Sequence, residues 1–142
     1  MVRGEVHVTL KRIDMQKIKS LSDKRLIVQA TLNGKPARFL LDTGSSVGLI
    51  DRNIRKKYGL VKGRAFPHSL IGAGGEFTAY YCNTFAKLQD RTLTQFLLAD
   101  IDSIVESIKR QTCIEIQGII SLPQMQFAHI SLDADDSLVI LE

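Results

Sequence analysis

The chain has few cysteines and histidines, the residues that form disulfide frameworks and many metal sites. Its two cysteines, Cys82 and Cys113, have no metal-ligand spacing and are too few for a disulfide scaffold. We expect both thiols to be reduced and packed, which is typical of a cytoplasmic protein. The three histidines, His7, His68 and His129, are scattered along the chain without ligand spacing. The sequence therefore predicts no metal site and no cofactor.

Long hydrophobic runs are also missing. No stretch is long and apolar enough to span a bilayer, so we expect no membrane partner. The first twelve residues, MVRGEVHVTLKR, contain no apolar core of a signal peptide. A chain trimmed of a targeting segment would look the same, and within that limit we expect a cytoplasmic location.

Positive and negative charges are nearly balanced, with a net charge of +4. One basic cluster stands out, and no aromatic residues interleave with it to stack on bases. We interpret it as a solvated helix face and expect no nucleic-acid partner. Its members are Arg52, Arg55, Lys56, Lys57, Lys62 and Arg64. The segment G-S-S-V-G also lacks the Lys-Ser/Thr pair of a phosphate-binding loop.

What the chain does contain is a series of short strand patterns. Its 142 residues fit a single domain, residues 1–142. Apolar and polar residues alternate over Leu26–Leu32, Asn33-Gly34 is a strong hairpin signal, and Ala37–Leu41 is the return strand. A second hairpin is expected where Ile130–Leu132 and Leu138–Leu141 flank the polar segment D-A-D-D-S. Further strands are expected at Glu5–Lys11, Val47–Ile50, Leu93–Ala99 and Ile116–Ile120.

Helical patterns are few and short. Asp51 can cap a helix over Arg52–Tyr58 that ends at Gly59. A second helix is expected around Ile101–Ile108, where Ser103 and Glu106 form a capping-box pattern, with Lys109 and Arg110 at its C-terminal end. Pro123–Phe127 is expected to form one helical turn. The prediction is an all-β, closed or barrel-like domain with one or two short helices.

The most informative stretch is Phe39–Ser46, which reads F-L-L-D-T-G-S-S. An apolar strand carries Asp42 toward the interior, and Gly44 allows a sharp turn that exposes it. A carboxylate at the end of a buried strand is costly unless it is paired or used in chemistry. The stretch therefore marks Asp42 as a candidate catalytic residue.

From Leu26 to its C-terminus, the chain resembles the retropepsin-like aspartic peptidases, in particular their single-domain prokaryotic members. Residues 1–22 are an extension outside this resemblance. The resemblance implies an acid-protease half-barrel in which two Asp-Thr-Gly loops meet across a dimer two-fold. It assigns catalysis to Asp42, loop-to-loop contact to Thr43, and close substrate approach to Gly44, with Ser45 supporting the loop.

The resemblance also assigns two further segments. A Gly-rich hairpin made of Ile71, Gly72, Ala73, Gly74 and Gly75 falls where the family has a mobile flap that closes over substrate. The loop behind the catalytic aspartate is made of Gly118, Ile119, Ile120 and Ser121. Ser121 stands where the family usually has glycine, and its side chain could crowd the backbone behind the catalytic loop.

Amide hydrolysis by carboxylates needs one group to activate water and one to protonate the carbonyl oxygen. This chain has a single Asp-Thr-Gly, so the second carboxylate must come from a second copy. The sequence predicts a homodimeric aspartic endopeptidase acting on peptides or proteins. The resemblance also implies that terminal strands hold the dimer together, and we expect Leu138–Leu141 to contribute as an apolar edge strand, with an internal core strand as the other interpretation of this segment. The alternative is a catalytically weak or inactive dimeric module of the same fold that binds a peptide or a protein partner.

Overall fold

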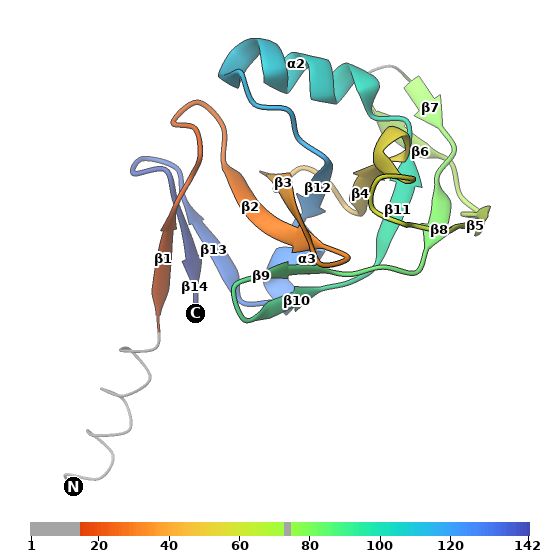
Figure 1. The fold of residues 1–142 in the computed structure, drawn as a ribbon. Helices are drawn as coiled ribbons and strands as arrows, with labels where there is room; N and C mark the ends of the chain where they lie inside the picture. Colours follow the sequence, from red (N-terminus) through yellow and green to blue (C-terminus); the bar gives the residue numbers. More distant parts are fainter. Residues whose placement is uncertain (1–14, 73–74) are drawn as a thin grey trace, which may run out of the picture.

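The computed structural model describes residues 15–72 and 75–142, and most of its ordered elements are strands (Figure 1). The strand expected at Glu5–Lys11 lies outside the described residues. No helix in the described part of the chain is long and apolar enough to cross a membrane.

The body of the molecule is a nine-stranded sheet in the order β10-β9-β2-β3-β12-β4-β11-β8-β5. A three-stranded sheet in the order β1-β14-β13 and a two-stranded hairpin, β6–β7, complete the fold. Figure 1 shows these two smaller sheets on opposite sides of the main sheet. The strands are β1 (Gln16–Lys19), β2 (Ile27–Leu32), β3 (Lys35–Asp42), β4 (Gly48–Asp51), β5 (Lys62–Ala65), β6 (Leu70–Gly72), β7 (Gly75–Phe77), β8 (Tyr80–Cys82), β9 (Ala86–Leu88), β10 (Arg91–Leu93), β11 (Phe96–Ala99), β12 (Gly118–Ser121), β13 (Ile130–Asp133) and β14 (Leu138–Leu141).

The hairpin that leads to Asp42 forms as the sequence predicts. Asn33 and Gly34 take positive φ values of 50° and 82°, the geometry of a two-residue hairpin turn. Within β3, residues Phe39–Leu41 are apolar without alternation because both faces of the strand are covered there. Phe39 and Leu41 pack in one core and Leu40 in another, each side chain 6% exposed or less. Burial of each such side chain contributes roughly 1.5–3 kcal/mol.

The longer helix, α2 (Asp102–Thr112), covers one face of the main sheet (Figure 1). The capping box expected at Ser103 and Glu106 is wrong, because Ile101 is the N-cap and Ser103 is already inside the helix. Asp100 instead accepts a hydrogen bond from the Asp102 N–H at 3.1 Å. Lys109 and Arg110 lie in the last turn, as expected.

The helix expected over Arg52–Tyr58 is only a 3₁₀ turn, η1 (Arg52–Ile54), followed by hydrogen-bonded turns. Asp51 does cap it, accepting from the Asn53 N–H at 3.0 Å. The reading of the basic cluster as one helix face is therefore wrong. Lys62 and Arg64 lie on strand β5 instead.

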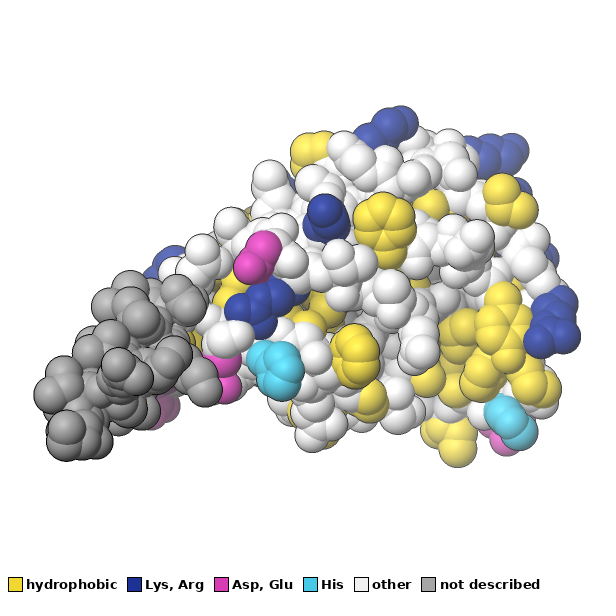
Figure 2. All heavy atoms as spheres, turned by 90° about the horizontal axis from the view of Figure 1, so that it is seen from below, with side chains coloured by type: hydrophobic (Ala, Val, Ile, Leu, Met, Phe, Trp, Pro, Cys, Tyr) yellow, Lys and Arg dark blue, Asp and Glu magenta, His cyan; other side chains and the backbone are white. Residues whose placement is uncertain are grey.

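In space, these two cations do have aromatic neighbours. The Lys62 ammonium lies 3.9 Å from the ring centre of Tyr80, and the Arg64 guanidinium lies 5.0 Å from that of Tyr81. Figure 2 shows hydrophobic side chains gathered with Lys and Arg at this end of the molecule, which carries β5 and β8. The tyrosine rings are thus already contacted by the chain's own cations.

Strand β14 is not the unpaired edge that the sequence predicts at Leu138–Leu141. It is the middle strand of its sheet, antiparallel to β1 on one side and to β13 on the other. Val139 and Leu141 are fully buried, so this segment is an internal core strand. Its partner β1 had no signal in the sequence, because Gln16–Lys19 is mostly polar and exposed.

Asp51 gives the fold a testable pH dependence. Burial raises the pKa of its carboxyl, and the negative charges of Asp102, Asp100 and Glu115 add to the rise, while the Asn53 N–H opposes it. A folded pKa above the unfolded value of 3.8 means that protonation stabilises the folded state. The charged form therefore costs stability at neutral pH, and stability is regained as the pH falls through the raised value toward 3.8.

We expect Asp51→Asn, which keeps an acceptor for the Asn53 N–H, to be more stable than wild type at pH 7. This advantage should shrink as the pH is lowered toward 4. Urea unfolding of both proteins across this range measures the difference in their free energies of unfolding. In that difference, contributions from titrating groups that the substitution does not affect cancel. A gap that stays constant with pH would contradict this account of Asp51.

Candidate active site

Asp42 is held where three strands of the main sheet meet. Strand β12 lies between β3 and β4, parallel to β3 and antiparallel to β4. Ser121 is paired with Asp42 in this register. The loop that leaves Asp42 must therefore cross the end of β12 before it re-enters the sheet as β4. This crossing fixes both ends of the loop on buried strands, while Asp42 itself is half-buried.

The turn after Asp42 directs a backbone donor at its carboxylate. The Gly44 N–H donates to Asp42 Oδ1 at 2.9 Å, and the Ser45 N–H donates to the Asp42 carbonyl at 3.1 Å. A Cβ at Gly44 would lie 3.2 Å from the same Oδ1, so a side chain here would crowd the carboxylate. Gly44 thus gives the Asp42 carboxylate both a hydrogen bond and free space.

The next residues of the loop are tied to the chain behind it. The Ser45 hydroxyl donates to the Val47 carbonyl at 2.7 Å, and the Ser45 carbonyl accepts from the Leu122 N–H at 3.1 Å. Ser45 therefore anchors the loop to the start of helix α3 (Leu122–Phe127). The Thr43 side chain is exposed at the tip of the turn.

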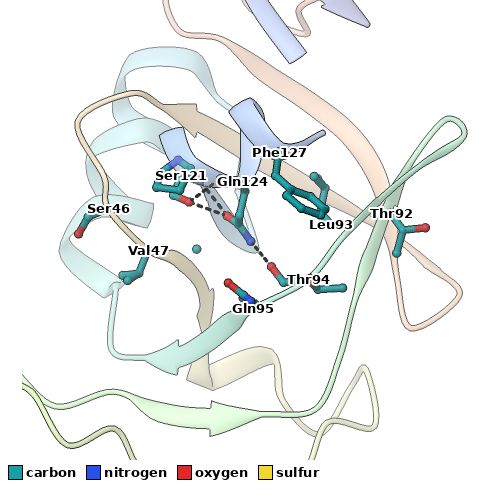
Figure 3. A pocket seen from close by; sticks show the side chains of 11 residues that line it. Ser46, Val47, Thr92, Leu93, Thr94, Gln95, Ser121, Gln124 and Phe127 are labelled. Carbon is teal, nitrogen blue, oxygen red and sulfur yellow. Dashed lines mark hydrogen bonds between the residues drawn. The ribbon is translucent and has the colours of Figure 1, made fainter. Parts of the chain in front are cut away.

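Ser121 does not crowd the loop that follows Asp42. It is 1% exposed and is the N-cap of α3, in a capping box with Gln124. Gln124 Oε1 accepts from the Ser121 N–H at 2.9 Å and from its hydroxyl at 3.0 Å (Figure 3). Gln124 Nε2 donates to the Thr94 carbonyl at 2.7 Å. The serine side chain is thus used to begin a helix.

Gln124 and Gly48 are residues that the sequence analysis missed. A Cβ at Gly48 would overlap the Gln124 amide, so glycine here leaves the space that the amide fills. The signal was present in the sequence, because S-x-x-Q at 121–124 is a capping-box pattern with proline just inside the helix.

A cavity of about 290 Å³ lies beside this network, between the end of the Asp42 loop, α3 and the β10–β11 turn (Figure 3). The turn breaks the single strand expected at Leu93–Ala99, because Gln95 takes a φ of 67°. Ser46, Val47, Gln124 and Phe127 are among the lining residues, and Asp42 is not. The cavity therefore lies next to the end of the Asp42 loop, and the Asp42 carboxylate does not line it.

The other residues singled out by the sequence fall into two groups. Gly118, Ile119 and Ile120 form buried strand β12, directly behind Asp42. Ile71 and Gly72 lie on β6 and Gly75 on β7, which pair as the expected hairpin with Gly72 opposite Gly75. Ala73 and Gly74 lie outside the described residues.

Among residues 15–72 and 75–142, no group of three His, Cys, Asp or Glu is placed to hold a metal ion.

A half-barrel that presents one Asp-Thr-Gly loop over a crossing of three strands defines the retropepsin-like class of aspartic proteases. Residues 28–122 match the family model described as "Aspartyl protease", so the chain belongs to that family. No curated protein matches it.

Two solved structures share the fold. One is EIAV protease complexed with the inhibitor HBY-793, at 20% sequence identity and a TM-score of 0.60, covering 82% of this chain and 99% of the other. The other is a retropepsin-like aspartic protease from Rickettsia conorii, at 15% identity and a TM-score of 0.55, covering 89% of each chain. At these identities the likeness concerns the fold alone.

Proposed function

We propose that this protein is an aspartic endopeptidase whose active site forms between the Asp42 carboxylates of two identical chains. The observation that carries the proposal is the placement of Asp42. Its half-buried carboxylate lies at the end of a buried strand and accepts a hydrogen bond from the Gly44 N–H. Because Gly44 has no Cβ, the space beside the carboxylate stays open. Other acids have structural roles: Asp51 caps η1, and Asp100 accepts the Asp102 N–H just before α2.

The chemistry follows from two facing carboxylates. Like charges a few ångströms apart do not both ionise readily, so the pair holds one proton. The ionised Asp42 takes a proton from water, which attacks the amide carbon. The protonated Asp42 of the second copy donates to the carbonyl oxygen. One chain supplies one Asp-Thr-Gly loop, so this mechanism requires a two-fold dimer.

The alternative of a non-catalytic binding module rested on crowding by Ser121 and on the lack of a visible targeting or processing signal in the sequence. Since Ser121 caps α3 and its hydroxyl points to Gln124, the first of these grounds does not apply here. The enzyme is therefore the function that the geometry of the catalytic loop supports best.

Hydrolysis of a mixed peptide library should show a bell-shaped pH profile. At low pH both carboxylates are protonated and no base is left, and at high pH both are charged and no acid is left. The two limbs belong to the pair of carboxylates together. Mass spectrometry of the library across acid to alkaline pH measures the profile. A folded, dimeric protein that cleaves nothing at any pH would be consistent with the fold but would contradict the proposed enzymatic activity.

We also propose that the β6–β7 hairpin is the flap that closes over the substrate. It forms its own two-stranded sheet, and Ile71 on it is 82% exposed, which leaves most of this apolar side chain available to a substrate. Burying that side chain against substrate would contribute roughly 1.5–3 kcal/mol.

Ile71→Asn should therefore lower kcat/KM about tenfold or more and leave thermal stability nearly unchanged. The matched control is Val61→Asn, because Val61 is 74% exposed just before β5. Steady-state kinetics and melting curves of both variants give the comparison. Equal effects of the two substitutions on kcat/KM would mean that Ile71 is an ordinary surface residue that does not contact the substrate.

A further inference from the structure

The outer strand of the main sheet, β5, carries positive charge that no carboxylate of the described residues neutralises. It is the last strand in the sheet order, and all 4 of its residues are exposed. Lys62 and Arg64 lie on it, and the ion pairs formed within residues 15–72 and 75–142 include neither side chain. The sequence contains no Asp or Glu in residues 52–75. This edge of the sheet is therefore a concentration of unpaired positive charge.

The two cations lie on opposite faces of the sheet. The Lys62 ammonium is 3.9 Å from the ring centre of Tyr80, and the Arg64 guanidinium is 5.0 Å from that of Tyr81. Neighbouring residues of a strand point to opposite faces. Here Tyr80 packs against one core cluster and Tyr81 against the other. The outer edge of β5 therefore runs between one cation on each face.

A third cation lies on the Lys62 side of this edge. Burial raises the pKa of the Cys82 thiol, and the positive charge of Arg55 opposes that rise. Cys82 is paired with Lys62 in the β5–β8 ladder, so Arg55 adds its charge close to Lys62. Figure 2 shows Lys and Arg side chains gathered with hydrophobic ones at this end of the molecule. Charge concentrated in this way attracts anionic partners.

An extended peptide fits this arrangement better than other anionic partners do. A flat layer of lipid headgroups contacts one face of a sheet at a time. Single-stranded nucleic acid binds largely by stacking its bases on aromatic rings, and both tyrosine rings here are already contacted by the chain's own cations. An extended peptide presents successive side chains to opposite sides. Two neighbouring carboxylates can therefore reach Lys62 and Arg64 at the same time.

We propose that the outer edge of β5 binds an extended acidic segment of the protein substrate, with neighbouring Asp or Glu side chains on Lys62 and Arg64. Lysine on an edge strand opposes the addition of an ordinary strand, and the same charge makes the edge selective for an acidic one. This inference rests on the proposed function, because it names the class of substrate.

The corner formed by β5 and β8 is continuous with the hairpin proposed as the flap. Strand β5 leads into β6 through residues 66–69, and β7 leads into β8 through residues 78–79. The ring centres of Phe66 and Tyr81 are 5.6 Å apart, so the first connection packs on β8. Figure 1 shows β5, β8 and the hairpin on the same side of the molecule. A substrate held by its acidic segment at β5 is thus tethered next to the flap, which raises its local concentration there.

Peptide binding to the Asp42→Asn protein tests the surface without cleavage. The probe is a fluorescein-labelled peptide with a run of Asp and Glu, and its twin carries Asn and Gln instead. Fluorescence anisotropy should show binding of the acidic peptide alone. Replacing Lys62 and Arg64 together by Gln should raise its dissociation constant about fivefold or more. The matched control replaces Lys24 and Lys87, both exposed elsewhere, by Gln and should leave the constant nearly unchanged.

Two further comparisons separate charge and geometry from a general loss of structure. The exchange of Lys62→Arg with Arg64→Lys keeps both charges and should keep the affinity, and circular dichroism checks that every variant is folded. A peptide with the same number of Glu residues, each separated from the next by Gln, presents them all to one face. It should bind about twofold or more weakly than the peptide with neighbouring Glu residues. Equal affinities would contradict the two-faced site.

Cleavage kinetics test the link to the proposed function. An acidic run joined to a peptide that the wild-type protein cleaves should lower KM and leave kcat unchanged, because the run contacts a surface away from the reacting amide. The double Gln variant at Lys62 and Arg64 should lose this decrease in KM and cleave the peptide without the run as wild type does.

The outcomes separate this surface from the enzyme. Acidic peptide bound by the Asp42→Asn protein, from a wild type that hydrolyses no peptide, would support the docking surface and contradict the proposed activity. Cleavage with a KM that neither the acidic run nor the double Gln variant changes would support the enzyme and contradict the docking surface. Tighter binding of single-stranded DNA or of anionic phospholipid vesicles than of the acidic peptide at the same salt concentration would assign the edge to another class of partner and overturn the proposal.

Discussion

Asp42→Asn should abolish peptide hydrolysis and leave the chain folded and dimeric. The asparagine keeps an oxygen that accepts the Gly44 N–H bond, so the turn survives the change. It removes the group that takes a proton from water on one side and donates one on the other. Acid–base groups of this kind contribute about 10²–10⁴-fold to rate. The variant loses that group from both halves of the site.

Asp51→Asn is the matched control for this variant. Asp51 is also an aspartate at the end of a buried strand, β4, and it also accepts a backbone N–H, from Asn53. It caps η1 and takes no part in the proposed chemistry, so its variant should keep full activity. Peptide hydrolysis, sedimentation and melting curves should be compared for both. If Asp42→Asn cleaves at the wild-type rate, the proposed mechanism is wrong.

The part of the fold that the sequence predicts best is the part governed by local chemistry. Asn33-Gly34 determines its hairpin because few other residue pairs take two positive φ values in a row. The unbroken apolar run before Asp42 marks a strand that is covered on both faces, and the structure places its side chains in two separate cores. These features depend on neighbours in the sequence, so the sequence shows them.

The errors arise where distant segments decide the outcome. Leu138–Leu141 was expected at a dimer edge because apolar strands seek partners, but the partner on one side is β1, more than a hundred residues earlier. Gln16–Lys19 is too polar to be recognised as a strand, and pairing with β14 is what orders it. Ser103 and Glu106 do not form the expected capping box because the helix begins earlier, with Ile101 as its N-cap. The Asp102 N–H there donates to the Asp100 carboxylate.

The candidate site shows the same division. The sharp turn at Asp42 and Gly44 could be predicted from the sequence because its geometry is set within three residues. The role of Ser121 could not be assigned from family resemblance, since the available space depends on Gln124, Thr94 and the missing Cβ of Gly48. A residue that looks like a defect against a family pattern becomes a helix cap once its neighbours are known.

Gly118→Ala should be one of the most damaging single-methyl additions to this chain. Gly118 begins β12 between β3 and β4, opposite Phe39 on one side and Ile50 on the other. A Cβ there would lie 2.6 Å from the Phe39 ring and 2.7 Å from the Leu49 carbonyl oxygen. The ring is fully buried and the carbonyl belongs to the backbone, so neither can move without shifting a strand. Overpacking of this kind costs about 1–3 kcal/mol, and sometimes more.

The shift caused by Gly118→Ala would reach the catalytic loop, because β3 and β4 are the two strands on which the loop is anchored. We therefore expect activity to fall even at temperatures where the variant stays folded. Ile119→Val is the control in the same strand, since it removes a methylene and should cost about 0.5–1.5 kcal/mol without forcing the strands apart. Urea unfolding measures the stability of each variant. The value of kcat/KM at a temperature well below both melting points shows whether displacement of the Asp42 loop lowers activity. A Gly118→Ala protein as stable as wild type would show that β3 and β4 are not packed against β12 as closely as described. Stability lost without any loss of activity would instead show that the position of Asp42 does not depend on this strand crossing.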